Sequence, residues 1–311
     1  MSAASPLVSV VIPTYKGGAL LVETLESVFA QTFDDYEVIV INDGSPDDTL
    51  ERLVPFQQRH GEKLRVVTQE NAGIGRARNR GIDEARGRYI AFCDHDDLWM
   101  PEKLAVQVAY MQSHPQCAAC GTMYANSPAP EKPTFEVSEV ADEQGIVARP
   151  AWHIVRGRQV FQTLTLMVDA EKAKELRYAT ERGAIEDASY FLQLLGRGEY
   201  GIAGNRILAI YRVFEGNASK ASDYYYKGIL QLRRLERAGA FEALSPAKAA
   251  EAKLWIGQIA RATAVTQITH RRRGRGLWIY LLEWPYQVKQ LRFRFLLGYP
   301  VLLLFSAFSR K

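Results

Sequence analysis

Four apolar runs alternate with amphipathic stretches before residue 95, and this alternation constrains the fold more than any other feature. The runs are "LVSVVIPTY", "YEVIVINDGS", "KLRVVTQ" and "RYIAFCD". Runs this rich in apolar and β-branched residues are typical of strands buried on both faces of a sheet. Strands that alternate with helices favour parallel pairing through right-handed crossovers. We therefore predict an α/β fold with a mostly parallel, doubly wound sheet.

Polar residues follow three of these predicted strands. Thr14 and Tyr15 end the first run, Asp43 follows the second, and Asp94 begins an acidic cluster after the fourth. Ligands of doubly wound sheets bind at the carboxyl ends of the strands. We therefore expect these side chains to contribute to one site.

The acidic cluster is "DHDD", residues 94–97, and it directly follows an apolar run. Carboxylates crowded beside a buried strand repel one another and resist desolvation. One interpretation is a solvated turn in which Asp96 or Asp97 caps the helix that Pro101 opens. The other is a site for Mg²⁺ or Mn²⁺, which are bound by hard oxygen ligands together with substrate phosphates. The cluster alone leaves both interpretations open.

Two common nucleotide-binding motifs are missing. A dinucleotide-binding domain needs G-x-G-x-x-G after the first strand, but that place holds "PTYKGGAL". The P-loop sequence G-x-x-x-x-G-K-[ST] is also absent. Neither class of protein would explain the acidic cluster.

An ordered set of motifs resembles family 2 of the glycosyltransferases, which are inverting enzymes of the GT-A fold. The motifs are "VSVVIPTYKGG", "NDGS", "ENAGIGRARN", "DHDD" and the later "IED", and the resemblance covers roughly residues 7–220. It implies transfer of a sugar from a nucleotide donor to an acceptor hydroxyl. The Q-x-x-R-W signature of processive synthases is absent, so we expect one sugar per encounter.

The resemblance assigns roles to the residues that follow the strands. It implies that Asp96 binds Mn²⁺ or Mg²⁺ directly and that Asp94 faces the ribose or the metal. Asp43 would accept the N3–H of uracil, while Thr14 and Tyr15 would line the base pocket. UDP is the favoured nucleotide, although dTDP presents the same N3–H. An Asx turn is the alternative role for Asp43, since Asn-Asp-Gly-Ser favours turns.

The resemblance also implies that Asp187 is the catalytic base and that Glu186 beside it positions the acceptor. The sequence pattern without the resemblance would indicate only that both carboxylates stabilise a helix N-terminus. Arg76 and Arg212 are candidates for the donor phosphates. Arg76 shares a helix face with Arg80, so a solvated basic face is the alternative.

The positive charge of the chain lies at its C-terminal end. Residues 270–311 contain nine Lys or Arg and one Glu, whereas the whole chain carries +4. The apolar run at 295–308 has 14 residues and is shorter than the ~20 that span a bilayer. We expect a peripheral membrane contact through this tail and no nucleic-acid binding. A packed helix pair or a dimer contact remains an alternative.

These observations predict two domains, a GT-A catalytic domain at residues 1–220 and a helical C-terminal region at 221–311. No basic segment precedes the first apolar run, so we expect a cytoplasmic protein on the inner face of the membrane. The expected acceptor is a lipid-linked or glycan molecule in bacterial surface polysaccharide or glycolipid assembly. The alternative function is a sugar-phosphate nucleotidyltransferase, which also uses an α/β sheet and a metal.

Overall fold

The computed structural model describes residues 5–127, 162–181, 185–214, 224–241, 244–269, 272–289 and 298–300. The chain divides into two compact units. The first comprises residues 1–180 and 186–214, and the second comprises residues 181–185 and 215–311. The domain boundary predicted at residue 220 falls outside the described residues and stays a prediction.

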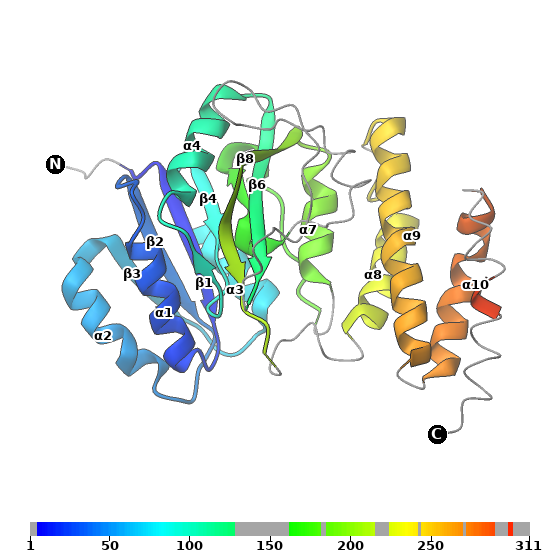
Figure 1. Cartoon of the computed structure of the whole chain (residues 1–311), viewed down its shortest axis with the longest axis horizontal. Helices are drawn as coiled ribbons and strands as arrows, with labels where there is room; N and C mark the ends of the chain where they lie inside the picture. The colour runs from blue at the N-terminus through cyan, green and yellow to red at the C-terminus, as the bar shows by residue number, and fades with distance from the viewer. Residues whose placement is uncertain are drawn as a thin grey trace. The chain divides into compact units, whose positions relative to one another are not determined.

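The first unit contains an eight-stranded sheet with the order β3-β2-β1-β4-β7-β6-β8-β5 (Figure 1). Its first half consists of β1 (Val8–Thr14), β2 (Tyr36–Asn42), β3 (Leu64–Thr68) and β4 (Tyr89–Phe92). These strands pair in parallel, with β1 between β2 and β4 and with β2 between β1 and β3. The four apolar runs therefore form the parallel strands that the sequence predicts.

The second half of the sheet is mixed. It contains β5 (Leu98–Trp99), β6 (Cys117–Asn126), β7 (Met167–Asp169) and β8 (Glu199–Tyr211). Strand β7 runs antiparallel between β4 and β6, and β5 runs antiparallel along β8. Strands β6 and β8 are parallel to each other. The prediction of a mostly parallel sheet thus applies most fully to the N-terminal half.

The helices of the first unit are α1 (Gly18–Phe29), α2 (Thr49–His60), α3 (Ile74–Glu84), α4 (Lys103–Ser113), α6 (Ala170–Ala173) and α7 (Glu186–Leu194). Helices α1 and α3 pack on opposite faces of the parallel half, and α4 packs on β6 and β8 of the mixed half. Alternate residues of β2 point to opposite faces. Val38 and Val40 join the large core that includes Leu21 and Leu25 of α1, whereas Ile39 and Ile41 pack with Ala77 of α3.

The second unit contains α8 (Tyr224–Arg237), α9 (Pro246–Thr269) and α10 (Arg273–Lys289). Helix α9 packs against both α8 and α10. A buried ion pair joins α8 to α10, since Arg233 Nε donates to Glu283 Oε1 at 2.7 Å and a terminal nitrogen contacts Oε2 at 2.5 Å. Among the described residues, no helix is both long and apolar enough to cross a membrane.

One glycine in α3 is required by close packing. A Cβ atom at Gly75 would lie 2.0 Å from the carbonyl oxygen of Ala179. Gly274 is the second residue of α10, as Gly75 is of α3, but a Cβ there would meet no atom within 4 Å. Both glycines therefore occupy the same position in their helices, but only Gly75 is packed against another segment of the chain.

We predict that Gly75→Ala lowers the free energy of unfolding by about 1–3 kcal/mol, because the backbone at Ala179 must move. Gly274→Ala is the matched control and should be neutral or stabilising by up to about 1 kcal/mol. Urea unfolding followed by circular dichroism measures both. Equal effects of the two substitutions would contradict the packing argument.

Candidate active site

The strand ends that carry the predicted site residues meet at one edge of the sheet. Thr14 pairs in register with Asn42, and Val11 pairs with Phe92. The Asp43 N–H donates to the carbonyl oxygen of Thr14 at 2.8 Å. Thr14, Asp43 and Asp94 therefore follow adjacent strands at the same edge, as expected. The Thr14 hydroxyl is buried and has no hydrogen-bond partner in the described part of the chain.

Asp43 is buried and fixes the start of α3. Its carboxylate accepts hydrogen bonds from the backbone of Ala72 at 2.9 Å and Gly73 at 2.8 Å, and from Gln69 Nε2 at 2.8 Å. The side chain that bonds locally to the backbone of the NDGS turn is that of Asn42, whose Oδ1 accepts the Ser45 N–H at 3.1 Å. A carboxylate offers about four acceptor sites. Asp43 therefore holds the loop before α3 and keeps acceptor capacity.

A buried arginine connects the acidic cluster to α7. Arg78 is 2% exposed, and it donates to Asp94 Oδ1 at 2.7 Å and to Glu186 Oε1 at 3.0 Å. Its guanidinium also lies 5.1 Å from the centre of the Tyr178 ring. Arg78 thus brings Asp94 and Glu186, which are far apart in sequence, into one site.

Sequence reasoning did not single out Arg78 as a site residue. Arg76, the predicted candidate, is exposed. Arg80 is exposed as well and pairs with Glu84 at 2.7 Å. The contact of Arg76 with the donor phosphates stays a prediction. The signal for Arg78 was present in the spacing, since Gly75, Arg78 and Ile82 form the buried face of α3.

Asp187 lies in the first turn of α7, next to Glu186. Its Oδ1 accepts the Ala188 N–H at 2.7 Å. Burial, followed by the neighbouring Glu186 charge, raises the pKa of Asp187 from 3.8 to about 7. A carboxyl group with such a pKa is divided between its acid and base forms near neutral pH.

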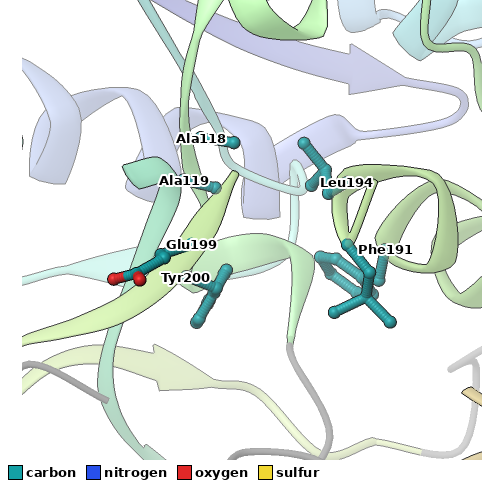
Figure 2. Close-up of a pocket in the computed structure, with 7 residues that line it drawn as sticks. Ala118, Ala119, Phe191, Leu194, Glu199 and Tyr200 are labelled. Atoms are coloured by element: carbon teal, nitrogen blue, oxygen red, sulfur yellow. The ribbon is translucent and has the colours of Figure 1, made fainter. Parts of the chain in front are cut away.

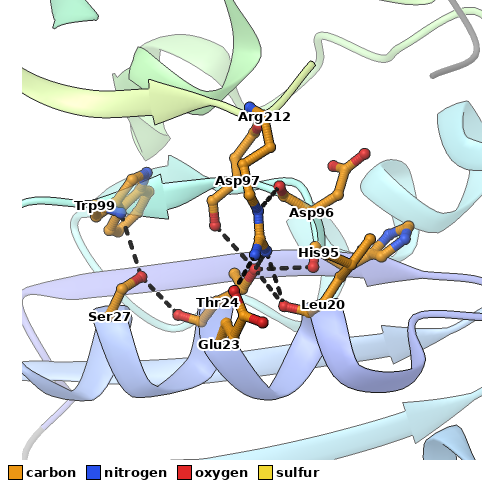
Figure 3. A network of polar contacts seen from close by, with 9 residues as sticks. All are labelled: Leu20, Glu23, Thr24, Ser27, His95, Asp96, Asp97, Trp99 and Arg212. Carbon is orange, nitrogen blue, oxygen red and sulfur yellow. Dashed lines mark hydrogen bonds and ion pairs between the residues drawn. The ribbon is translucent and has the colours of Figure 1, made fainter. Parts of the chain in front are cut away.

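The acidic turn is fastened to α1 through Thr24 and Arg212 (Figure 3). The Thr24 hydroxyl lies 2.8 Å from the carbonyl oxygens of both His95 and Asp97. The Arg212 guanidinium contacts the Asp96 carbonyl oxygen and the Glu23 carboxylate, and it donates to the Leu20 carbonyl at 2.9 Å. Arg212 therefore positions the turn, and its contact with the donor phosphates stays a prediction.

Asp97 does not cap a helix. It is fully buried, its Oδ1 accepts the Arg212 N–H at 3.0 Å, and α4 begins only at Lys103. Its Oδ2 has no partner among the described residues. Burial raises the pKa of Asp97 well above its usual value.

Asp96 fits a metal ligand. Within the described ranges it makes no ion pair, and its carboxylate points away from Arg212 in Figure 3. Burial, and then the Asp94 charge, raise the pKa of Asp96. A bound cation would favour the charged form of such a carboxylate. The described residues contain no group of three or more side chains of metal-binding type, and Mg²⁺ is often held by one or two carboxylates plus phosphates.

A separate crevice lies between the C-terminal part of α7 and the beginnings of β6 and β8 (Figure 2). Its roughly 210 Å³ of non-atom space includes open solvent and leaves no enclosed room for a water molecule, and most of its lining is apolar. The starts of β6 and β8 lie at the sheet edge opposite the ends of β1, β2 and β4, because β6 is parallel to β4 through the two antiparallel pairings of β7. The crevice is therefore separate from the acidic turn.

Comparison with solved structures identifies the fold. The chain aligns with TarS 1–349 of S. aureus in complex with UDP-GlcNAc at a TM-score of 0.57 and 17% identity, covering 88% of this chain and 89% of that one. It aligns with the mannosyltransferase PcManGT of Pyrobaculum calidifontis, in complex with GDP-Man and Mn²⁺, at a TM-score of 0.63 and 16% identity, covering 98% and 85%. The fold is the GT-A fold of glycosyltransferases, as predicted.

The sequence comparisons identify the family. The profile described as "Glycosyl transferase family 2" matches residues 9–146. A putative teichuronic acid biosynthesis glycosyltransferase, TuaG of Bacillus subtilis (strain 168), is 28% identical over 244 residues, which are 76% of this chain and 93% of that protein. An uncharacterized glycosyltransferase of Rickettsia bellii (strain RML369-C) is 41% identical over 103 residues, only 15% of its own length. Residues 9–146 thus match family 2 of the glycosyltransferases, and the chain is a glycosyltransferase.

The raised pKa of Asp187 predicts a pH-dependent cost to stability. The folded protein binds more protons than the unfolded chain between pH 3.8 and about 7, so stability falls as pH rises through that window. We predict that Asp187→Asn raises the melting temperature at about pH 8, where about 2–4 °C corresponds to 1 kcal/mol. This advantage over wild type should shrink at about pH 5.

The control for the loss of one carboxylate is Asp35→Asn, because Asp35 is exposed. Thermal unfolding of the three proteins across this pH range makes the measurement. An Asp187→Asn advantage that is equal at all pH values would contradict a carboxyl group that ionises near pH 7.

Proposed function

We propose that the protein transfers a single sugar, with inversion, from a nucleoside diphosphate donor to an acceptor hydroxyl. The observation that carries the proposal is the Arg78 bridge, which holds Asp94 and Glu186 at 2.7 and 3.0 Å. Through it the acidic turn after β4 and the first turn of α7, with Asp187, form one site. The side chains proposed to bind the donor therefore lie next to the one proposed to remove the proton.

The donor nucleotide is proposed to bind across the ends of β1 and β2. Tyr15 is 41% exposed and offers a ring face to a base. Asp43 is oriented by three donors and retains acceptor capacity for the N3–H of a pyrimidine. This chemistry favours UDP, with dTDP as the close alternative. The structural neighbours were solved with UDP-GlcNAc and with GDP-Man, so the preference for UDP depends on Asp43.

The leaving diphosphate is proposed to be held at Asp96 and Asp94 with Mn²⁺ or Mg²⁺. Such an ion would neutralise the charge that develops on the leaving group. Asp96 would be the direct ligand because it makes no ion pair among the described residues, whereas Asp94 already pairs with Arg78. Arg212 and Thr24 keep the backbone of the turn in place for this role.

Asp187 is proposed as the catalytic base. A base is most effective when its pKa lies near the working pH, and burial raises the pKa of Asp187 to about 7. It would take the proton of the acceptor hydroxyl as that oxygen attacks the anomeric carbon opposite the leaving group. A single in-line displacement inverts that carbon. Glu186, anchored by Arg78, would position the acceptor.

The acceptor is proposed to be lipid-linked or a glycan, in the assembly of a bacterial surface polysaccharide or glycolipid. TuaG is named for teichuronic acid biosynthesis, and the basic C-terminal region of this chain suits a membrane surface. We accordingly propose a catalytic domain at residues 1–220, a membrane-apposed region at 221–311, and a location on the cytoplasmic face of the membrane. The match to family 2 over residues 9–146 favours this transfer reaction over the sugar-phosphate nucleotidyltransferase.

A donor screen tests the proposal. Nucleotide release from UDP-, dTDP- and GDP-sugars, and thermal shifts with the same nucleotides, are measured with Mn²⁺, with Mg²⁺ and with a chelator. We predict stabilisation by UDP or dTDP that requires the metal and disappears with the chelator. Equal stabilisation by all the nucleotides would contradict the role of Asp43, and stabilisation that survives the chelator would contradict the role of Asp96.

Two substitutions should separate the proposed roles. Asp187→Asn should lower kcat by about 10²–10⁴-fold with little change in the donor KM, because only proton removal is lost. Asp96→Asn should instead raise the Mn²⁺ concentration needed for half-maximal activity, since one ligand is lost. Asp35→Asn, at an exposed site, is the control. If Asp187→Asn retains wild-type turnover, Asp187 is not the base.

A further inference from the structure

Helix α10 has one buried face and one exposed apolar face among the residues that the structure describes. Ile279, Tyr280 and Glu283 are buried on one face. The other face carries large hydrophobic side chains that are 38–55% exposed. We name this set the α10 stripe: Leu277, Trp278, Leu281, Trp284 and Val288.

The α10 stripe is a continuous surface. Leu277, Leu281, Trp284 and Val288 are separated by four, three and four residues, so they form one line along the helix, and Trp278 lies beside it. The described residues include 13 exposed large hydrophobics, of which the 17 residues of α10 carry five. Scattered single hydrophobics are normal on a protein surface, but a contiguous group marks an interaction site.

The buried ion pair fixes which face of α10 is exposed. Glu283 is fully buried and contacts Arg233 of α8 through both carboxylate oxygens. Glu283 and the α10 stripe lie on different faces of the helix, as the helical periodicity requires. Rotating α10 to bury its stripe would break this pair and leave charges uncompensated, which costs much more than an exposed apolar face. The stripe is therefore kept at the surface.

Positive charge surrounds the stripe in sequence. Arg272, Arg273 and Arg275 stand at the start of α10, and Lys289 ends it, while the only acidic residue in residues 270–311 is the buried Glu283. Trp and Leu side chains next to Arg and Lys are typical of helices that lie in the interfacial layer of an anionic bilayer. Like charges on two copies of this surface would disfavour self-association.

We propose that the α10 stripe docks on the headgroup region of an anionic membrane, with Trp278 and Trp284 inserted and the flanking arginines on the lipid phosphates. This deepens the membrane contact suggested above and places it on α10, upstream of the apolar run at 295–308. It rests on the proposed function only in the choice of a lipid-linked acceptor, since binding needs neither donor nor metal.

The test is sedimentation of the full-length protein with phosphatidylcholine vesicles and with phosphatidylcholine–phosphatidylglycerol vesicles. The wild type should bind the anionic vesicles preferentially and lose affinity at high salt. The double substitution Trp278→Ser/Trp284→Ser should weaken binding by about tenfold or more, because two large apolar side chains are no longer inserted. Brominated lipids should quench the tryptophan fluorescence of the wild type and not that of this variant.

The matched control is Leu50→Ser/Val54→Ser, which removes two hydrophobics of α2 that are 42% and 46% exposed. This control should bind vesicles as the wild type does. The proposal fails if the tryptophan variant binds vesicles as well as the wild type. It also fails if the wild type does not bind and ultracentrifugation shows a dimer that the variant loses, because the stripe then contacts a second copy.

A third outcome would overturn the proposal. If the wild type does not bind and the tryptophan variant has a markedly lower melting temperature, another part of this chain covers the stripe. The metal-dependent thermal shift with UDP is measured on the same variants. It should be unchanged in all of them, so a failure of membrane binding is distinguished from a failure of the proposed transfer reaction.

Discussion

The charge of Arg78 is the constraint on which the arrangement of the site depends. Its guanidinium is buried between Asp94 and Glu186, which come from the end of β4 and the start of α7. Without a cation at this point, two carboxylates would face each other in a poorly hydrated space. Because Arg78 is carried by α3, the packing of that helix against β1 and the Ala179 segment sets the geometry of both acidic elements.

Around Arg78 some carboxylates form ion pairs with arginines and others do not. Arg212 and Thr24 satisfy the backbone of the acidic turn, and the Asp96 carboxylate makes no ion pair in the described part of the chain. Burial raises the pKa values of Asp96 and Asp187. Both effects cost stability in the free protein. These costs are explained if Asp96 binds a cation and Asp187 takes up a proton during the reaction.

The sequence was informative where a pattern is local. The β-branched runs identified β1 to β4, and the polar residues after them predicted the edge at which Thr14, Asp43 and Asp94 meet. Strand β6 was missed because "CAACGTMYAN" contains mostly small residues, and it is buried without alternation. The contacts of Arg212 with Glu23 and Leu20 cross about 190 residues of sequence, so no local pattern could distinguish an anchoring arginine from a phosphate ligand.

The position of Asp43 limits how the nucleotide preference of this scaffold can change. The same carboxylate that would read the base also holds the backbone of Ala72 and Gly73, immediately before the helix that carries Arg78. A substitution of Asp43 that suits a purine would remove the hydrogen bonds that hold the start of α3. It would thereby also disturb the contacts of Arg78 with Asp94 and Glu186. The donor preference would therefore change more easily, in evolution or by engineering, through substitutions at exposed neighbours such as Tyr15. Its exposed side chain does not hold the start of α3 as Asp43 does.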